Sequence, residues 1–458
     1  MAQWGVPLLV AAAALAAGCQ GAPARVEPAE DIARPDFRGV VKRAADRVFP
    51  AVVYIKCIRE THEAGKKTSE EVSGSGVLIS ASGEVLTNWH VVDKAVEVRC
   101  LLYDGRAMEA RVVGTDKDTD LALAALKVPP GQTVPFATLG DSDAVREGDF
   151  VMAMGAPWGL SRSVSIGIIS CTRRFLPDHS EYSLWLQTDA SISPGNSGGP
   201  LVNTDGEVVG LNTRAVMFGG DMGFAIPSNT IRYLVAQIRQ AGRVDWAWTG
   251  LQLQPLKDFN RNTYFDGTQG VIVAETDPES PARRAGILAR DRLLEVGGAR
   301  LNALTEEDLP AVRRHLGLLA KHQGVEVLLL RDGQARRFSL TPREKGKVEG
   351  AELDCPRWDF TVKQINQFDN PDLFFHRQEG VFIYGVKDPG NADNAGLRAK
   401  DIILRLGGRE VVTLDDVKRV HAEALKNLRQ QHRVMVTVLR NGLMREVVLD
   451  FSRDYEKE

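Results

Sequence analysis

The sequence predicts a mainly β protein in which an all-β barrel or sandwich region is followed by two smaller domains of one fold. Three observations support this prediction. Short apolar and β-branched runs recur through residues 36–240, separated by Gly, Asp-Gly and Pro turn signals, and this stretch is long enough for two six-stranded barrels. The C-terminal part contains an internal repeat. A chain of 458 residues is also too long for a single hydrophobic core.

A short amphipathic helix is predicted at the start of the barrel region, over residues 36–48. Asp36 is a candidate N-cap, and apolar residues fall on one side of the helix. Pro50 is expected to end it, because proline cannot continue a helix from its interior. Strands are predicted to include 51–55, 76–79, 84–87, 96–103 and 208–211, and the polar stretch 59–73 is predicted to be an exposed loop.

The C-terminal repeat consists of short motifs that recur 110 positions apart. Gly-Val-Ile-Val at 270–273 returns as Gly-Val-Phe-Ile at 380–383, Ala285-Gly286 as Ala395-Gly396, Asp291 as Asp401, and Gly297-Gly298 as Gly407-Gly408. The order of these motifs is the same in both copies. Two related domains are therefore predicted at 246–342 and 352–452, joined by a charged linker at 343–350.

The N-terminal residues 1–19 have the pattern of an export signal. The apolar run at 8–17 is too short to span a bilayer, and Ala-Ala-Gly at 16–18 precedes Cys19. Small residues before a cysteine resemble the bacterial lipobox, in which the cysteine is lipidated and becomes the new N-terminus. The alternative is a plain secretory signal with a coincidental cysteine. We expect an exported, membrane-anchored protein on the periplasmic side, with residues 20–35 as a flexible tether.

Charge and composition argue against several other classes of function. The net charge is −3 and no run of Lys or Arg suggests a nucleic-acid partner. No Cys/His spacing suggests a metal site, and no cofactor is predicted. In an exported protein the remaining cysteines are either free buried thiols or paired in disulfides; these are Cys57, Cys100, Cys171 and Cys355.

Three motifs carry residues suited to nucleophilic attack on a carbonyl group. Ser197 lies in Gly-Asn-Ser-Gly-Gly-Pro at 195–200, where glycines let the backbone turn and present several N–H groups together. His90 follows Thr-Asn-Trp, and histidine is the side chain best suited to take the serine proton and return it to the leaving group. Asp120, followed by Leu-Ala-Leu, would hold the histidine in the required tautomer.

Other residues compete for these roles less well. His62 is a rival base, but it lies in the polar stretch, and Asp116 and Asp118 lack the apolar run that follows Asp120. Gly195–Gly199 also satisfies G-x-S-x-G, the nucleophile elbow of α/β-hydrolases. That interpretation fails because Pro200 and a strand–turn–strand pattern follow the serine, and because the candidate partners precede it.

The motifs at 87–92, 118–123 and 195–200 resemble those of the HtrA/DegP family of serine proteases, and their order His, Asp, Ser is that of the chymotrypsin-type triad. The resemblance implies a chymotrypsin-like double β-barrel protease domain at 36–240 and two PDZ domains. It implies a serine endopeptidase that cleaves unfolded or damaged envelope proteins and assembles from trimers. The competing class is a PDZ-bearing chaperone or scaffold with a latent protease domain, which the intact triad disfavours.

The same resemblance assigns further site residues. The backbone N–H groups of Gly195 and Ser197, with Asn196 between them, would form the oxyanion hole. The substrate pocket would be lined by Ile192, Leu211, Asn212 and Thr213. Because Ile192 is apolar, we expect a preference for small or medium aliphatic side chains before the cleaved bond.

The PDZ resemblance also predicts a peptide site. Trp248, Thr249, Gly250 and Leu251 would form a loop whose N–H groups bind a C-terminal carboxylate, while the peptide adds a strand to the sheet edge. The second domain has Asp359 where the first has Gly250, and this negative charge would oppose a peptide carboxylate. The second PDZ domain is therefore expected to serve in assembly or as a scaffold.

Overall fold

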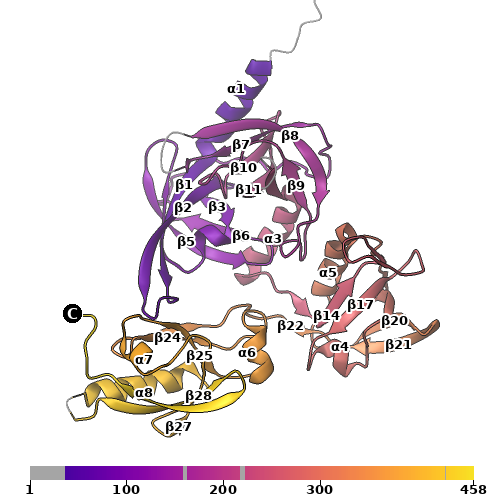
Figure 1. The fold of residues 1–458 in the computed structure, drawn as a ribbon. Coiled ribbons are helices and arrows are strands. Elements are labelled where there is room, and N and C mark those ends of the chain that lie inside the picture. The colour runs from indigo at the N-terminus through magenta and orange to yellow at the C-terminus, as the bar shows by residue number, and fades with distance from the viewer. Residues whose placement is uncertain (1–36, 158–161, 217–221, 429, 458) are drawn as a thin grey trace, which may run out of the picture.

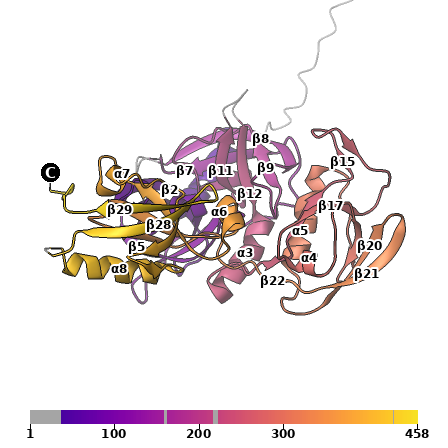
Figure 2. The same ribbon diagram turned by 60° about the horizontal axis from the view of Figure 1, so that its bottom comes forward.

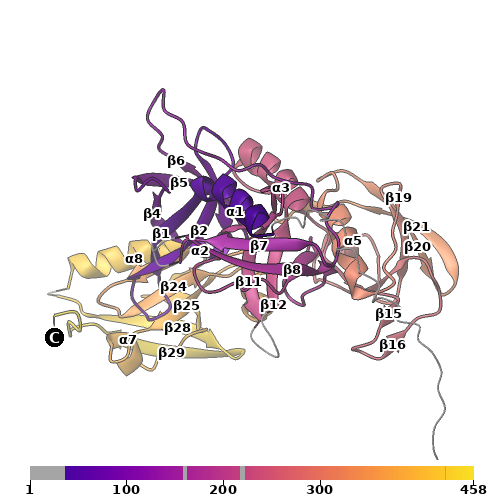
Figure 3. The ribbon, with the colours of Figure 1, turned by 90° about the horizontal axis from the view of Figure 1, so that it is seen from above.

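A computed structural model describes residues 37–157, 162–216, 222–428 and 430–457, and Figure 1 shows their arrangement. The predicted leader and tether, with Cys19 and Asp36, lie outside these residues. Helix α1 (Phe37–Val48) ends where predicted and passes into a 3₁₀ turn at Phe49–Ala51 that contains Pro50. The helix lies against the barrels (Figure 3). Its Ala44, Ala45 and Val48 are buried there, and Arg47 donates to the Asp205 carbonyl at 2.9 Å.

Two closed barrels of six strands follow, as predicted. The first has the order β1-β2-β3-β6-β5-β4 and the second the order β10-β11-β12-β9-β8-β7. The first barrel comprises β1 (Val52–Thr61), β2 (Thr68–Leu78), β3 (Glu84–Asn88), β4 (Ala95–Leu101), β5 (Ala107–Asp116) and β6 (Leu121–Leu126), with the short helix α2 (Trp89–Val92) after β3. The second comprises β7 (Phe150–Gly155), β8 (Ser163–Arg174), β9 (Trp185–Thr188), β10 (Pro200–Asn203), β11 (Val208–Val216) and β12 (Met222–Pro227), followed by helix α3 (Ser228–Ala241).

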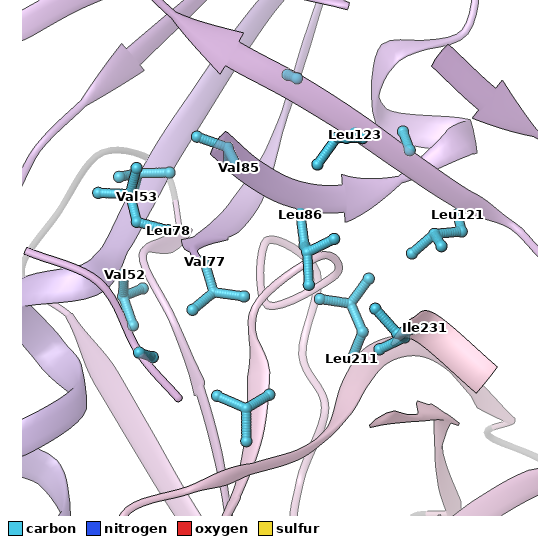
Figure 4. Close-up of a cluster of buried hydrophobic side chains, with 14 of the residues drawn as sticks. Val52, Val53, Val77, Leu78, Val85, Leu86, Leu121, Leu123, Leu211 and Ile231 are labelled. Atoms are coloured by element: carbon cyan, nitrogen blue, oxygen red, sulfur yellow. The ribbon is translucent and has the colours of Figure 1, made fainter. Parts of the chain in front are cut away.

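One hydrophobic core joins the two barrels. Leu86 and Leu121 from the first barrel lie near Leu211 from the second and Ile231 from α3, and all four are fully buried (Figure 4). Because apolar surface is shared in this way, the barrels are held at a fixed orientation and their facing loops meet along one seam.

The predicted loop at 59–73 is wrong. Most of it extends β1 and β2 into a long hairpin, with Ile58 opposite Glu71 and Thr61 opposite Thr68, so that only 62–67 form its loop. The polar residues belong to strands that project beyond the barrel, where neither face is buried in the core, and an ion pair between Arg59 and Glu70 at 3.5 Å spans the ladder. Figure 1 shows this hairpin reaching the second C-terminal domain, near β24 and β25.

The first C-terminal domain is a five-strand sheet path with helices against it. Its strand order is β14-β17-β18-β20-β21, and the short strand β13 pairs with β22 instead. The elements are β13 (Ala247–Trp248), β14 (Leu251–Gln254), β15 (Lys257–Asp258), β16 (Thr263–Tyr264), β17 (Val271–Thr276), α4 (Pro281–Arg284), β18 (Arg292–Val296), β19 (Ala299–Arg300), a 3₁₀ turn (Glu306–Asp308), α5 (Leu309–Gly317), β20 (Val325–Arg331), β21 (Gln334–Leu340) and β22 (Arg343–Glu344).

The second C-terminal domain repeats this plan with one additional strand at its edge, in the order β23-β24-β25-β26-β28-β29. Its elements are β23 (Glu352–Cys355), β24 (Phe360–Gln364), α6 (Pro371–His376), β25 (Val381–Val386), α7 (Asn391–Asn394), β26 (Ile402–Leu406), β27 (Arg409–Glu410), α8 (Leu414–Lys426), β28 (Arg433–Arg440) and β29 (Leu443–Asp450). Figure 2 shows the two domains on different sides of the barrels.

The repeated aspartates have one structural role. Asp291 is buried and accepts two hydrogen bonds from Arg331, at 2.7 and 2.6 Å, and buried Asp401 accepts two from Arg440, both at 2.6 Å. Each pair joins the loop after the small helix to the end of a sheet strand, so the repeat preserves a bidentate charge pair in both domains.

Cys57, Cys100, Cys171 and Cys355 are free thiols, which answers the question that composition left open. Burial raises the pKa of Cys57 to about 11 and that of Cys100 to about 12, so both remain protonated and unreactive at neutral pH. No helix within the described ranges is long and apolar enough to cross a membrane.

Candidate active site

His90 and Asp120 meet in the first barrel. The Nδ1 atom of His90 lies 2.8 Å from Oδ2 and 3.0 Å from Oδ1 of Asp120, and the backbone N–H of His90 donates to Oδ1 at 3.0 Å. The Asp120 carboxylate is almost completely buried, whereas the His90 ring is partly exposed. This geometry leaves the Nε2 side of the ring available to a reacting group.

Local backbone structure places both residues. Asp120 has a positive φ of 57° at the end of a turn, and its carbonyl accepts the N–H of Trp89 at 3.0 Å and the side chain of Asn88 at 3.1 Å. The start of α2, which carries His90, is thereby bonded to the residue that carries the carboxylate. Aspartate tolerates this left-handed conformation better than most residues, which suits it to the position.

Ser197 lies on the second barrel, and Thr213 connects it to the first. The Ser197 hydroxyl donates to the Thr213 carbonyl at 3.1 Å, and the Thr213 hydroxyl accepts from Asn88 at 2.8 Å. The three sequence motifs therefore converge on the seam between the barrels. Within the described part of the chain the hydroxyl is bonded to Thr213 and not to His90.

The turn around Ser197 presents two free backbone donors. The N–H of Asn196 donates to the Ser193 carbonyl at 2.9 Å, whereas the N–H groups of Gly195 and Ser197 have no acceptor among the described residues. Gly198 is required here because it has a φ of 82°, and a Cβ at this position would lie 2.2 Å from the Ser75 carbonyl oxygen. Two unpaired donors beside a serine hydroxyl suit the binding of an oxyanion.

Ser75 is a site residue that sequence reasoning missed. This buried residue of β2 donates from its hydroxyl to the Gly195 carbonyl at 2.6 Å and from its N–H to the Ser197 carbonyl at 2.8 Å. Its hydroxyl also accepts the N–H of Ala156 at 2.8 Å. These bonds fix the Gly195 and Ser197 carbonyls and so hold the turn that carries the two N–H groups. The only sequence signal was its position between Gly74 and Gly76.

Two of the four predicted pocket residues, Leu211 and Asn212, have side chains that point into the protein. The side chain of Leu211 lies in the core between the barrels, and that of Asn212 is fully buried, donating to the carbonyls of Met154 and Pro200. Neither side chain reaches the surface, so neither lines a pocket in this conformation. Ile192 is nearly buried and lies beside Gly223. A Cβ added to Gly223 would lie 2.7 Å from the Cδ1 atom of Ile192. Thr213 contacts Ser197 through its carbonyl.

Trp246, which sequence reasoning also missed, lies outside the barrels and bonds to Asp116 at the start of the turn that carries Asp120. The buried carboxylate of Asp116 accepts from the Thr119 hydroxyl at 2.6 Å and from the indole N–H of Trp246 at 3.0 Å. Trp246 stacks on Tyr182, with ring centroids 3.9 Å apart. Burial, together with the charge of Asp118, raises the pKa of Asp116 to about 6. The segment that enters the first PDZ-like domain therefore completes this turn.

The rival residues have other partners. The Nδ1 atom of His62 lies 3.0 Å from the Glu352 carboxylate in the second C-terminal domain. Asp118 pairs with Lys345 at 2.7 Å in the linker between the C-terminal domains. Each serves a contact between domains, so neither competes with His90 or Asp120.

The candidate peptide loop of the first C-terminal domain precedes a free sheet edge. The carbonyls of Thr249 and Gly250 accept the N–H groups of Ala282 and Asp277, at 3.0 and 2.8 Å, and the N–H of Gly250 has no acceptor in the described ranges. A cavity of about 660 Å³ adjoins the loop. Its lining includes Leu316 of α5 and Phe374 of α6, so both C-terminal domains contribute to it.

Two closed barrels with a histidine, an aspartate and a serine at their seam define a trypsin-like serine endopeptidase. Family comparisons agree: residues 74–211 match the trypsin-like peptidase domain, and residues 246–317 and 361–450 each match the PDZ domain. The chain is 36% identical over 379 residues to a probable periplasmic DegP-like serine endoprotease of Halomonas elongata, covering 81% of this chain and 77% of that protein. A relative of the same description from Chlamydia trachomatis is 30% identical, covering 83% and 75%.

Solved structures give the same assignment. The HtrA-type protease AlgW, solved with a tripeptide, superposes with a TM-score of 0.59 at 31% identity, over 67% of this chain and 97% of that one. A serine endoprotease from Yersinia pestis superposes with a TM-score of 0.52 at 30% identity, over 66% and 97%. The chain belongs to the DegP-like, HtrA-type family of serine endoproteases.

Proposed function

We propose that Ser197, His90 and Asp120 hydrolyse peptide bonds through an acyl-enzyme. His90 takes the Ser197 proton as the oxygen attacks the carbonyl carbon, and the N–H groups of Gly195 and Ser197 bind the resulting oxyanion. His90 then donates the proton to the leaving amine, and a water molecule repeats the sequence to release the acid. The observation that carries the proposal is the Asp120–His90 contact beside a serine with two unpaired backbone donors.

The Ser197 hydroxyl must turn from Thr213 toward His90 before it can react. Rotation about the Cα–Cβ bond to another staggered rotamer would free the hydroxyl from Thr213, and catalytic hydrogen bonds are often absent until substrate binds. A fluorophosphonate probe is expected to label the protein at Ser197 alone, as read by mass spectrometry. Labelling that persists in Ser197→Ala at another serine would contradict the assignment.

We propose unfolded or damaged proteins of the cell envelope as substrates, cleaved after small or medium aliphatic residues. Support comes from the periplasmic description of the relatives and from the apolar side chain of Ile192, which lies five residues before Ser197 and packs in the second barrel. We also propose an assembly built from trimers, as the family resemblance implies. The alternative, a chaperone or scaffold with a latent protease domain, is less well supported because the candidate triad is intact.

We also propose that Cys19 carries a lipid that anchors the protein to a membrane. Cys19→Ala is then expected to release the protein into the soluble periplasmic fraction or to leave its leader uncleaved, since two or more acyl chains are needed for stable anchoring. Cell fractionation with immunoblotting measures this outcome. Recovery of the unaltered protein in the soluble fraction would contradict the anchor and favour a plain secretory signal.

The first PDZ domain is proposed to bind peptide C-termini at its Gly250 loop. A Cβ at Gly250 would lie 2.1 Å from Cβ of Ser280, and φ here is +71°. Gly250→Asp is therefore expected to weaken binding of a peptide with a free apolar C-terminus at least about tenfold, by distorting the loop and adding charge. Gly298→Asp is the matched control, because Gly298 also has a positive φ but has open space around it. Equal affinities of both variants in a calorimetric titration would refute the site.

A further inference from the structure

The ligand-binding edge of the second PDZ domain is already paired. In the first domain β14 pairs with β17, and no other strand of the described residues pairs with its second edge. The corresponding strand β24 pairs with β25 on one side and with β23 on the other, with Leu353 opposite Val362 and Cys355 opposite Phe360. The strand before the loop differs in the same way, because β13 turns away from β14 and pairs with β22.

Strand β23 lies between β24 and helix α8, where a peptide would add to the sheet. Helix α8 contacts both strands, and its His421 lies 2.7 Å from the carbonyl oxygen of Pro356, directly after β23. Cys355 is fully buried in the domain core and Leu353 packs against that core. Side chains two apart on a strand point to one face, so both fill positions that a ligand's alternating side chains would occupy.

The loop after β23 connects β23 directly to β24, and its conformation resembles that of the Gly250 loop. Asp359 has a φ of 59°, close to the 71° of Gly250 in the first domain. Its buried carboxylate accepts the N–H of Asn391 at 2.9 Å and lies 3.7 Å from the Lys387 ammonium group. This acid is therefore used within the domain, and the strand in the groove leads into the loop instead of ending there.

The same strand is fastened to the protease domain. The Glu352 carboxylate contacts the ammonium groups of Lys94 at 2.6 Å and Lys363 at 3.3 Å. Burial raises the pKa of Glu352, but the bond to Lys94 and the two positive charges outweigh it, so the pKa is lowered and the carboxylate stays ionised. The tip of the β1–β2 hairpin adds a bond from the hydroxyl of Tyr384 to Glu63 at 2.7 Å.

We propose that the second PDZ domain has a peptide groove whose resident ligand is β23 of the same chain. The groove takes extended internal segments with apolar side chains at alternate positions, and it needs no terminal carboxylate. A tethered strand competes at a high effective concentration, so an outside segment binds only when β23 leaves. This proposal is independent of the peptidase residues.

The test uses the full chain in a Ser197→Ala background and a fluorescent peptide of residues 349–356, acetylated and amidated. Leu353→Asp places a charge against the core and is expected to displace β23, because an unpaired charge is costly to bury. The peptide is then expected to bind at least about tenfold more tightly than it binds the parent protein. Leu443→Asp, at an exposed position on β29, is the matched control and should not change binding.

Three outcomes would overturn the proposal. One is a folded Leu353→Asp variant, with an intact near-UV circular dichroism spectrum, that binds no better than Leu443→Asp. Another is loss of the binding through Gly250→Asp, which would place the peptide in the first domain. If Leu353→Asp fails to fold, hydrogen exchange of the parent protein tests the proposal instead. Millimolar peptide should then speed the exchange of the β23 amides and not that of the β28 amides. Unchanged protection of the β23 amides would overturn the proposal.

Discussion

Ser197→Ala is expected to lower kcat for an unfolded protein substrate by a factor on the order of 10⁶. The Ser197 hydroxyl is the proposed nucleophile, and among the described residues the N–H groups of Gly195 and Ser197 beside it have no acceptor. His90→Ala should cost about as much, because the serine then keeps its proton, and the double variant should lose little more since the residues act as a unit. Gel-based cleavage of a permanently unfolded protein, followed over time, measures all three variants.

Folding must be separated from chemistry in this comparison. Both single variants should keep the unfolding temperature of the parent within a few degrees, because each removes a partly exposed side chain. A chelator should leave the parent's activity unchanged. Proteolysis that survives Ser197→Ala, or that requires a divalent metal, would show that the serine mechanism is wrong.

Asp120→Asn is expected to lower kcat about 10⁴-fold while leaving the fold intact. Both carboxylate oxygens of Asp120 accept from His90, one from the backbone N–H and one from Nδ1–H. An amide can accept at only one of these positions, so its NH₂ group faces either a backbone donor or Nδ1. The second arrangement puts the proton on Nε2, where it blocks acceptance of the serine proton.

Asp118→Asn is the matched control for this change. It lies two residues away in the same acidic turn and pairs with Lys345, so we expect it to change kcat only a few-fold. NMR of the histidine ring protons would report the altered tautomer in Asp120→Asn alone. Equal losses in the two variants would mean that charge in the turn, and not the contact with His90, is what matters.

Local sequence patterns predicted the parts of this protein that local chemistry determines. Turn signals and apolar runs predicted a barrel or sandwich, the family resemblance predicted two barrels, and three short motifs predicted the candidate triad. The hairpin at 59–73 was missed because the loop at its tip is held by Glu352 and Tyr384, about 300 residues later in the chain. Ser75 and Trp246 were missed for the same reason, since each acts through a contact that only the folded chain creates.

Two of the four predicted pocket side chains do not line a pocket in this conformation, for a different reason. The motif Leu-Asn-Thr at 211–213 is correctly placed near Ser197, but alternation along β11 turns Leu211 into the core. The Asn212 side-chain amide already donates to the backbone carbonyls of Met154 and Pro200. Proximity in a motif therefore identified the strand but could not identify which of its atoms face a substrate.

The contact between Trp246 and Asp116 limits how this protein can be dissected. A fragment that stops after α3, at Ala241, would keep both barrels but lose the indole donor, leaving a buried carboxylate with one fewer partner at a cost of about 1–3 kcal/mol. It would also uncover the Tyr182 ring, against which both Trp246 and Gly317 of α5 pack. The smallest autonomous catalytic fragment therefore extends past the end of the second barrel, into residues that by homology belong to its neighbour.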